Sequence, residues 1–267
     1  LYGFGANETL VGKVLKPHRH KFILASKCGM QGVDVTGDGK LVRVIDGRPA
    51  TLQKTLEDSL RRLQTDVIDL YYLHRWDKTV PIEDSVGALA DIVKKGHIRS
   101  IGLSEVSSET LRKAHAVHPI AALQTEYSLW TRNPEIAVLQ ACKELGTAFV
   151  AFSPVARGFL CGAPIDVSAL DAKDIRRAMP RFLPENYAAN VKLLPAYHAI
   201  AEQAGCSPSQ LALGWLLHKA PHIIAIPGTT SVAHLLDDLG AANVTLSTLA
   251  IDQLDILINE HSVHGAR

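Results

Sequence analysis

The stretch Val67-Ile68-Asp69-Leu70-Tyr71-Tyr72-Leu73-His74 decides the fold of this chain. Its first seven residues are nearly all apolar or aromatic, which is typical of a strand buried on both faces of a parallel sheet. Five further short runs have the same character, and they cover residues 22–26, 98–103, 120–124, 148–152 and 222–226. We therefore expect six parallel strands.

Amphipathic helical patterns separate these runs. Residues 51–64 place Leu52, Leu56, Leu60 and Leu63 on one face at helical spacing. Comparable patterns cover residues 82–95, 107–116, 133–145, 207–218 and 231–241. This alternation predicts βαβ units, and no GxGxxG segment follows a strand, which disfavours a doubly wound dinucleotide fold. We predict an α/β chain with one domain over residues 1–267 and a loop insertion over residues 162–190.

Composition limits the functional classes. The chain has 267 residues, 47% of them hydrophobic, and its 28 basic and 27 acidic residues give a formal net charge of +1. This balance predicts no nucleic-acid partner, and the lack of a long uncharged apolar run predicts no membrane span. The four cysteines, Cys28, Cys142, Cys161 and Cys206, form no CxxC pair, so we expect a reduced, cytoplasmic protein without a metal site.

Polar and aromatic residues stand where the predicted strands end. In a (β/α)8 barrel these ends carry the functional groups. The residues are Lys27, His74, Ser104, Glu105, Gln124, Phe152 and Ser153, with Tyr2 before the first strand. Taken singly, each has a structural explanation, such as a solvated lysine or a core phenylalanine. Together they suit carbonyl reduction.

Carbonyl reduction needs a proton donor and a hydride donor. A tyrosine is a suitable acid, although a free phenol has a pKa of about 10. A nearby lysine ammonium lowers the pKa of a phenol, and a neutral histidine orients the carbonyl oxygen. No side chain supplies a hydride, so the chemistry implies a cofactor.

The residues and their order resemble the aldo-keto reductase superfamily. The segments that carry this resemblance are Tyr2-Gly3, Asn7-Glu8, Ala25-Ser26-Lys27, Leu73-His74-Arg75, Gly102-Leu103-Ser104-Glu105, Gln124-Thr125-Glu126-Tyr127-Ser128-Leu129-Trp130, Phe152-Ser153-Pro154, Arg157-Gly158 and Ile226-Pro227-Gly228-Thr229. They look most similar to the bacterial and plant branch with Ser-Glu and Glu-Tyr-Ser-Leu-Trp motifs. The resemblance implies a (β/α)8 TIM-type barrel that interconverts carbonyls and alcohols with NADPH or NADH.

The resemblance also implies a role for each matched residue. Tyr2 is the implied acid/base, Lys27 modulates its pKa and His74 orients the substrate. Ser104, Glu105 and Gln124 hold the nicotinamide carboxamide, and Phe152 stacks on its ring. The segment Ser153, Pro154, Val155, Arg157 and Gly158 lies along the pyrophosphate. The adenosine end is surrounded by Gly228, Thr229, Thr230, Ser231, His234, Asp237 and Asp238.

Two departures from the family pattern matter. The family has an Asp five residues before the Tyr, whereas this sequence begins one residue before Tyr2. The first strand, first helix and second strand of the barrel are missing as well, so we expect six of eight strands and an N-terminally incomplete sequence. The second departure is that no Lys or Arg occurs between Lys219 and Arg267, where relatives bind the 2′-phosphate of NADPH. The usual preference of the family favours NADPH, whereas the lack of basic residues in this segment favours NADH.

Several alternatives stay open. Lys27 could serve a barrel aldolase as a Schiff-base amine, and the chain could be a cofactor-binding regulatory subunit or an inactive relic. Trp76 and Trp130 either line a pocket for an aromatic or mid-sized apolar carbonyl or pack beneath loops. In a barrel, the insertion over residues 162–190 is expected on the catalytic face. The physiological substrate, the reaction direction and the oligomeric state do not follow from the sequence.

Overall fold

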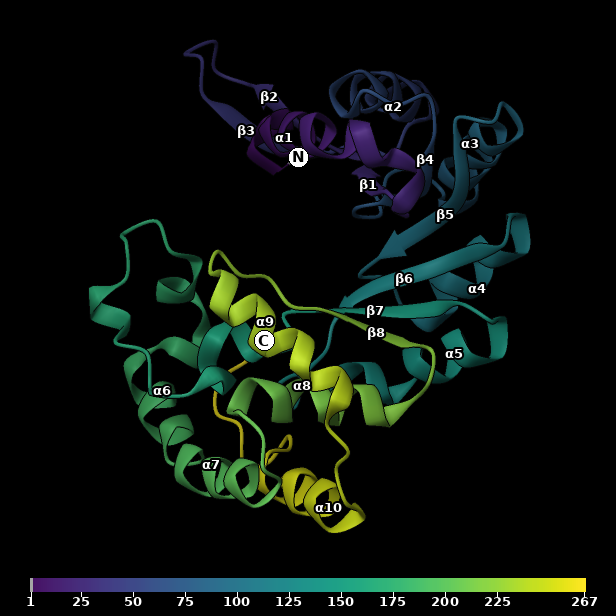
Figure 1. Ribbon diagram of the computed structural model, residues 1–267. Coiled ribbons are helices and arrows are strands. Elements are labelled where there is room, and N and C mark those ends of the chain that lie inside the picture. Colours follow the sequence, from purple (N-terminus) through teal and green to yellow (C-terminus); the bar gives the residue numbers. More distant parts are fainter. Residues whose placement is uncertain (1) are drawn as a thin grey trace. The chain divides into compact units, whose positions relative to one another are not determined.

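The computed structural model describes residues 2–267, and its internal contacts divide them into two compact units (Figure 1). The first unit runs to Thr125 and includes Ala137–Phe149, and the second comprises Glu126–Ile136 and Val150–Arg267. The prediction of a single domain stays a prediction.

A parallel sheet dominates the first unit. Its strands are β1 (Ala25–Cys28), β4 (Ile68–Leu73), β5 (Ile98–Ser104) and β6 (Ile120–Glu126). They continue the order β1-β4-β5-β6-β7-β8, in which β7 (Ala148–Phe152) begins in the first unit and ends in the second, which also holds β8 (Ile223–Ile226). The parallel registers align Lys27 of β1 with Tyr72 of β4, and Tyr72 with Gly102 of β5. The six predicted strands and the α/β class are confirmed.

Two strand predictions need correction. The first strand begins at Ala25 instead of Phe22, because Phe22 and Ile23 are exposed and only Leu24 is buried before it. The sequence analysis also missed an antiparallel hairpin of β2 (Met30–Asp34) and β3 (Leu41–Ile45). Its turn is held by the Asp34 carboxylate, which accepts hydrogen bonds from the backbone N–H groups of Gly37 and Gly39 at 2.7 and 2.9 Å.

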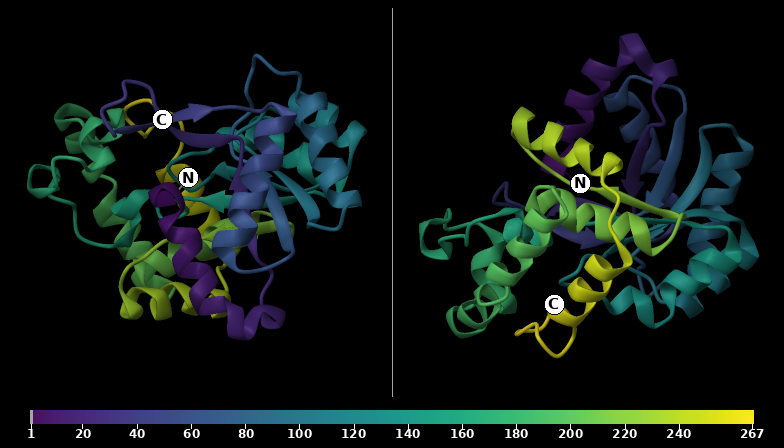
Figure 2. Two further views of the ribbon diagram at one scale, coloured as in Figure 1. Left: turned by 90° about the horizontal axis from the view of Figure 1, so that it is seen from above. Right: turned by 60° about the horizontal axis from the view of Figure 1, so that its bottom comes forward.

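Helices cover the strands of the first unit. They are α1 (Ala6–Leu15), α2 (Pro49–Leu63), α3 (Ile82–Lys94), α4 (Ser108–Val117) and α5 (Val138–Leu145), with the 3-10 turns η1 (Tyr2–Gly5) and η2 (Lys16–Lys21). Helix α2 buries Leu52, Leu56 and Leu63, as its spacing predicts. Helix α1 packs beside α2 (Figure 2), where the buried Glu8 carboxylate accepts from Arg62 Nε at 2.7 Å. Ser26 of β1 donates to the same carboxylate at 2.5 Å, so Glu8 links α1 to the sheet.

The second unit is mostly helical. Its helices are α6 (Pro184–Val191), α7 (Leu194–Gln203), α8 (Pro208–Lys219), α9 (Val232–Gly240) and α10 (Thr248–Leu257). Shorter 3-10 turns are η3 (Asn133–Ile136), η4 (Ala156–Cys161), η5 (Val167–Ala169), η6 (Ile175–Ala178), η7 (Pro180–Phe182) and η8 (Ala241–Asn243). Helix α8 begins with a capping box in which Ser207 and Gln210 satisfy each other's backbone N–H groups. The 162–190 insertion consists of the turns η5, η6 and η7 and of all but the last residue of α6.

No helix within residues 2–267 is long and apolar enough to cross a bilayer.

Candidate active site

Lys27 connects two other predicted site residues. Its Nζ atom on β1 donates to the Tyr2 hydroxyl oxygen at 2.7 Å and to Gln124 Oε1 at 2.5 Å. Tyr2 comes from η1 and is 53% exposed, whereas Gln124 comes from β6 and is buried. Three segments that are distant in the sequence thus bring a phenol, an ammonium group and a carboxamide together.

His74 also lies near the Tyr2 ring. Its backbone N–H donates to the Cys28 carbonyl at 2.9 Å just after β4, and its ring centroid lies 5.8 Å from that of Tyr2. The side chain is buried, and its Nδ1 atom has no hydrogen-bond partner among the described residues. Burial, followed by the positive charges of Lys27 and Arg75, lowers the pKa of His74 to about 3. The imidazole is therefore neutral at physiological pH.

The residues predicted to bind the nicotinamide carboxamide are Ser104, Glu105 and Gln124. All three already make hydrogen bonds within the first unit. Arg75 Nη1 donates to Ser104 Oγ at 3.0 Å, and Ser104 keeps its own hydroxyl hydrogen for another acceptor. Glu105 follows at a positive φ of 57°, and its backbone N–H donates to the Gln124 carbonyl at 3.0 Å. Because the Gln124 side chain bonds both Lys27 and Tyr72, it would have to exchange a partner to hold another amide.

Tyr72 and Arg75 are site neighbours that the sequence analysis did not assign. Burial raises the pKa of Tyr72 to about 12, although its hydrogen bond with Gln124 opposes that rise. The available signal was strand alternation, since Tyr72 lies two residues before His74. Arg75 follows His74 directly and also donates to the His74 carbonyl at 2.7 Å. Both residues support the groups around Tyr2.

In the second unit, the loop after β7 has an unusual backbone. Ser153, Ala156 and Arg157 have positive φ values of 52°, 53° and 56°, and Gly158 follows at 91°. Such left-handed turns aim successive N–H groups to one side and form anion-binding concavities. Arg157 Nη2 donates to the buried Glu126 carboxylate at 2.9 Å, while its buried Nε has no partner among the described residues.

Phe152, Pro154 and Val155 are the other predicted cofactor-binding residues of the loop after β7. Phe152 is the last residue of β7, Pro154 follows Ser153, and the Val155 carbonyl accepts the Gly158 N–H at 3.1 Å. The predicted pyrophosphate residues therefore form one continuous turn.

The segment after β8 forms the N-terminus of α9. Ser231 caps this helix by accepting from the His234 N–H at 3.4 Å, and Thr229 Oγ1 accepts from the Ser231 N–H at 3.1 Å. Gly228 and Thr230 complete this turn. Asp237 instead accepts from Ser207 Oγ at 2.8 Å at the start of α8, and Asp238 has a pKa raised by burial and by Asp237.

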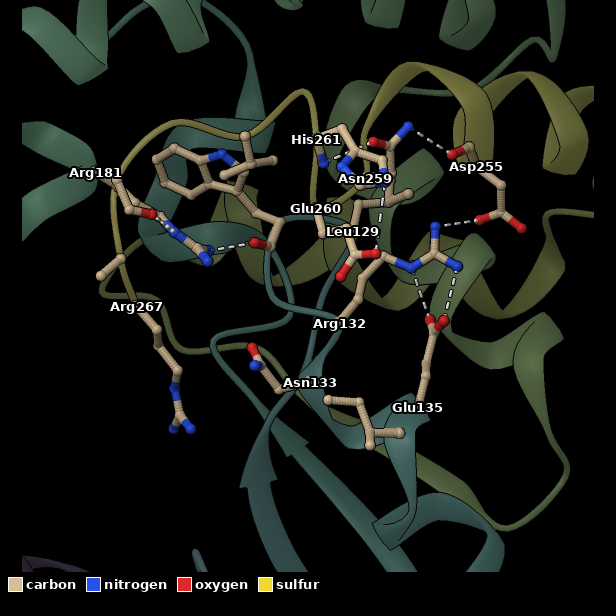
Figure 3. Close-up of a pocket in the computed structure, with 15 residues that line it drawn as sticks. Leu129, Arg132, Asn133, Glu135, Arg181, Asp255, Asn259, Glu260, His261 and Arg267 are labelled. Atoms are coloured by element: carbon tan, nitrogen blue, oxygen red, sulfur yellow. Dashed lines mark hydrogen bonds and ion pairs between the residues drawn. The ribbon is translucent and has the colours of Figure 1, made fainter.

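The two predicted pocket tryptophans differ in their surroundings. Trp76 is half-buried and donates to the Val80 carbonyl at 2.9 Å. Trp130 is only 4% exposed, stacks on Phe159 at 4.2 Å between centroids, and meets Phe182 edge-on. Packing under loops accounts for most of the Trp130 ring, although the residue also lines a pocket of the second unit (Figure 3).

Comparison with known proteins identifies the family. The model of the aldo/keto reductase family matches residues 1–259, so the chain belongs to this family. A glycerol dehydrogenase of Gluconobacter oxydans is 27% identical, with a TM-score of 0.90 over 100% of this chain and 81% of that one. A thermostable aldo-keto reductase solved with the inhibitor epalrestat is 29% identical, with a TM-score of 0.73 over 96% and 79% of the two chains.

A third similar structure is an aldo/keto reductase of Klebsiella pneumoniae solved with NADP and acetate. It is 25% identical to this chain, with a TM-score of 0.70 over 95% of this chain and 76% of that chain. The family has the (β/α)8 barrel fold, to which the described strands contribute six parallel members. The chain is thus a nicotinamide-dependent oxidoreductase that acts on carbonyl compounds and alcohols.

Proposed function

We propose that Tyr2, Lys27 and His74 are the catalytic residues of this carbonyl oxidoreductase. The observation that supports this most directly is the 2.7 Å contact between Lys27 Nζ and the Tyr2 hydroxyl. In reduction, Tyr2 donates its proton to the carbonyl oxygen, and the Lys27 ammonium stabilises the phenolate that remains. Neutral His74 donates a hydrogen bond that orients the same oxygen. A bound reduced nicotinamide supplies the hydride.

Each unit is proposed to contain cofactor-binding residues of its own. Ser104, Glu105 and Gln124 would hold the carboxamide, with the free hydroxyl hydrogen of Ser104 as one donor. Phe152 would stack on the ring, and the turn from Ser153 to Gly158 would receive the pyrophosphate. The left-handed turn and the unpartnered Nε of Arg157 support an anion there. The segment from Gly228 to Asp238, which includes the N-terminus of α9, would surround the adenosine end.

Cofactor preference is proposed as near even between NADPH and NADH. The Klebsiella pneumoniae structure contains NADP, which favours NADPH by family relationship. The α9 segment opposes it, because Asp237 and Asp238 are the charged residues there and Lys or Arg is absent between Lys219 and Arg267. A 2′-phosphate would gain only neutral hydrogen bonds from Thr230 and Ser231.

The four free cysteines favour a reducing, cytoplasmic location.

The test is steady-state reduction of 4-nitrobenzaldehyde with each cofactor. Tyr2→Phe should lower kcat by at least about a hundredfold because it removes the proton donor. Its cofactor dissociation constant and its circular dichroism should match the wild type, since Tyr2 is exposed. Near-normal turnover in this variant would refute the assignment of Tyr2.

Two other outcomes would favour the alternative functions. Cofactor binding without turnover in the wild type would favour a regulatory subunit or an inactive relic. Borohydride-dependent labelling of Lys27 in the presence of substrate would favour Schiff-base chemistry.

A further inference from the structure

A pocket of about 820 Å³ lies entirely within the second unit (Figure 3). The turn Leu129–Ile136, Arg181 and the C-terminal residues from Asp255 to Arg267 line it. This volume falls in the range that holds a drug-sized organic ligand. Trp130 is the only one of the predicted site residues that lines it, whereas the proposed catalytic and cofactor-binding residues do not. The pocket therefore needs its own explanation.

On one side of the pocket, the charged side chains are paired with one another. Arg132 donates to both carboxylate oxygens of Glu135 at 2.9 and 2.8 Å and reaches Asp255 at 3.0 Å. Asp255 also accepts from Lys219 at 2.8 Å. In Figure 3 this network lies on the right, and its charges already compensate one another. A ligand would gain little by displacing any member.

The opposite side holds a cation without a paired carboxylate. Arg181 Nε donates to the Gly265 carbonyl at 3.2 Å, and Nη1 donates to the Trp130 carbonyl and to Thr131 Oγ1. The Nη2 atom has no hydrogen-bond acceptor within the part of the chain that the structure describes, and Arg181 forms no ion pair there. A guanidinium group carries five donors, so two N–H bonds remain available.

The charge of Arg181 is only partly compensated. Burial lowers the pKa of Arg181 most, the Glu126 carboxylate opposes that shift, and the positive charge of Arg267 lowers the pKa further. Glu126 is itself paired with Arg157 and Arg267 at 2.9 and 3.4 Å. Arg267 lies on the same side of the pocket as Arg181 in Figure 3, and Asn133 lies to the right of Arg267. The exposed Asn133 side chain makes no hydrogen bond with the described residues, so its amide is a second available donor. An anion on Arg181 would supply the paired negative charge that this guanidinium group lacks.

Apolar side chains complete the lining. Leu129 and Val263 line the pocket, and Ile136 at its rim is 83% exposed. Covering an exposed isoleucine with an apolar ligand is favourable. The pocket therefore offers a cationic side and an apolar side to the same ligand.

We propose that this pocket binds an organic carboxylate with an apolar body, its carboxylate on Arg181 Nη2 and its apolar part against Leu129 and Ile136. The proposal does not depend on the catalytic assignment. It needs no turnover and no cofactor to be tested.

The test is calorimetric titration of the whole chain with 2-naphthoate and with the neutral, isosteric 2-naphthamide. The carboxylate should bind at least about tenfold more tightly, because only it pairs with Arg181. Asn133→Asp should weaken 2-naphthoate binding about tenfold by adding a negative charge, while leaving 2-naphthamide within about twofold. Position 133 is exposed and its side chain makes no hydrogen bond with the described residues, so this variant should fold.

A second variant should act in the opposite direction. Glu260 lines the pocket with its side chain 84% exposed, and Glu260→Gln should tighten 2-naphthoate binding about twofold by removing a like charge. Equal affinity for the acid and the amide would overturn the proposal. So would an Asn133→Asp variant that binds 2-naphthoate normally, or binding that is abolished by His74→Ala.

Discussion

Gly102 lies directly opposite Tyr72 in the β4–β5 register, and a methyl group at Gly102 would come within 2.4 Å of the Tyr72 ring. Tyr72 is hydrogen-bonded to Gln124, and Gln124 accepts from Lys27 at 2.5 Å. Gly102 therefore leaves room for the Tyr72 ring, and Tyr72 is connected through Gln124 to the Lys27 ammonium group.

Gly102→Ala should consequently lower both stability and activity. The added methyl group must displace the buried Tyr72 ring, which costs about 1–3 kcal/mol. Urea unfolding would measure this loss, and kcat should fall because Gln124 and Lys27 lose their support. Gly87→Ala is the matched control, because no atom lies within 4 Å of the new methyl group on α3. That variant should gain about 0.5–1 kcal/mol. Equal effects from the two substitutions would contradict this account of Gly102.

The depressed pKa of His74 predicts how stability depends on pH. The pKa of His74 in the folded protein is about 3, whereas a histidine in an unfolded chain has a pKa of about 6.5. Between these values the unfolded chain binds a proton that the folded chain does not, so the free energy of unfolding falls as the pH drops below 6.5. His74→Gln should lose less stability than the wild type between pH 7 and pH 5 in urea titrations. His20→Gln at an exposed position is the control, and parallel curves for His74→Gln and wild type would count against a buried neutral imidazole.

The absence of basic residues near α9 predicts that one arginine changes cofactor preference. His234→Arg would place a guanidinium in the first turn of α9, where a 2′-phosphate is proposed to lie. The dissociation constant of NADPH should decrease about tenfold, while that of NADH changes little. Leu239→Arg adds the same charge near the end of α9, at a side chain that is 62% exposed, and should have a much smaller effect. If both variants tighten NADPH equally, the effect is general charge and not a local contact.

Asn190 should be important for attachment of the C-terminal segment. Its buried side chain donates to the His264 carbonyl at 2.9 Å and accepts from the His264 N–H at 2.8 Å. Asn190→Ala would leave these backbone groups unsatisfied, at a cost of about 1–3 kcal/mol. Faster proteolytic removal of residues after Ile258, together with a lower urea midpoint, would verify this role. Asn190→Asp should be at least as harmful, because its buried carboxylate would face the Arg181 and His264 carbonyl oxygens that Asn190 Nδ2 now donates to. If Asn190→Ala is digested like the wild type, the hydrogen bonds between Asn190 and His264 are not needed to hold the C-terminal segment.

The sequence predicted regular elements well where the pattern was local. The runs beginning at Val67, Ile98, Ile120 and Ala148 became strands within two residues of their expected ends. The α2 and α3 patterns also formed helices, because one apolar stripe repeats over several turns. The hairpin of β2 and β3 was not predicted, because its residues are largely exposed or half-buried and show no clear apolar alternation. The candidate residues themselves came from family resemblance.

By itself, the amino-acid sequence determined the α/β class, the family and the identity of the candidate catalytic groups, because apolar periodicity and local motifs are written in consecutive residues. Tertiary structure alone decided which groups touch. Lys27 meets Gln124 across 97 positions, and Trp130 stacks on Phe159 instead of standing free. Parallel pairing sets such contacts through strand order and register, and both depend on the packing of the whole sheet.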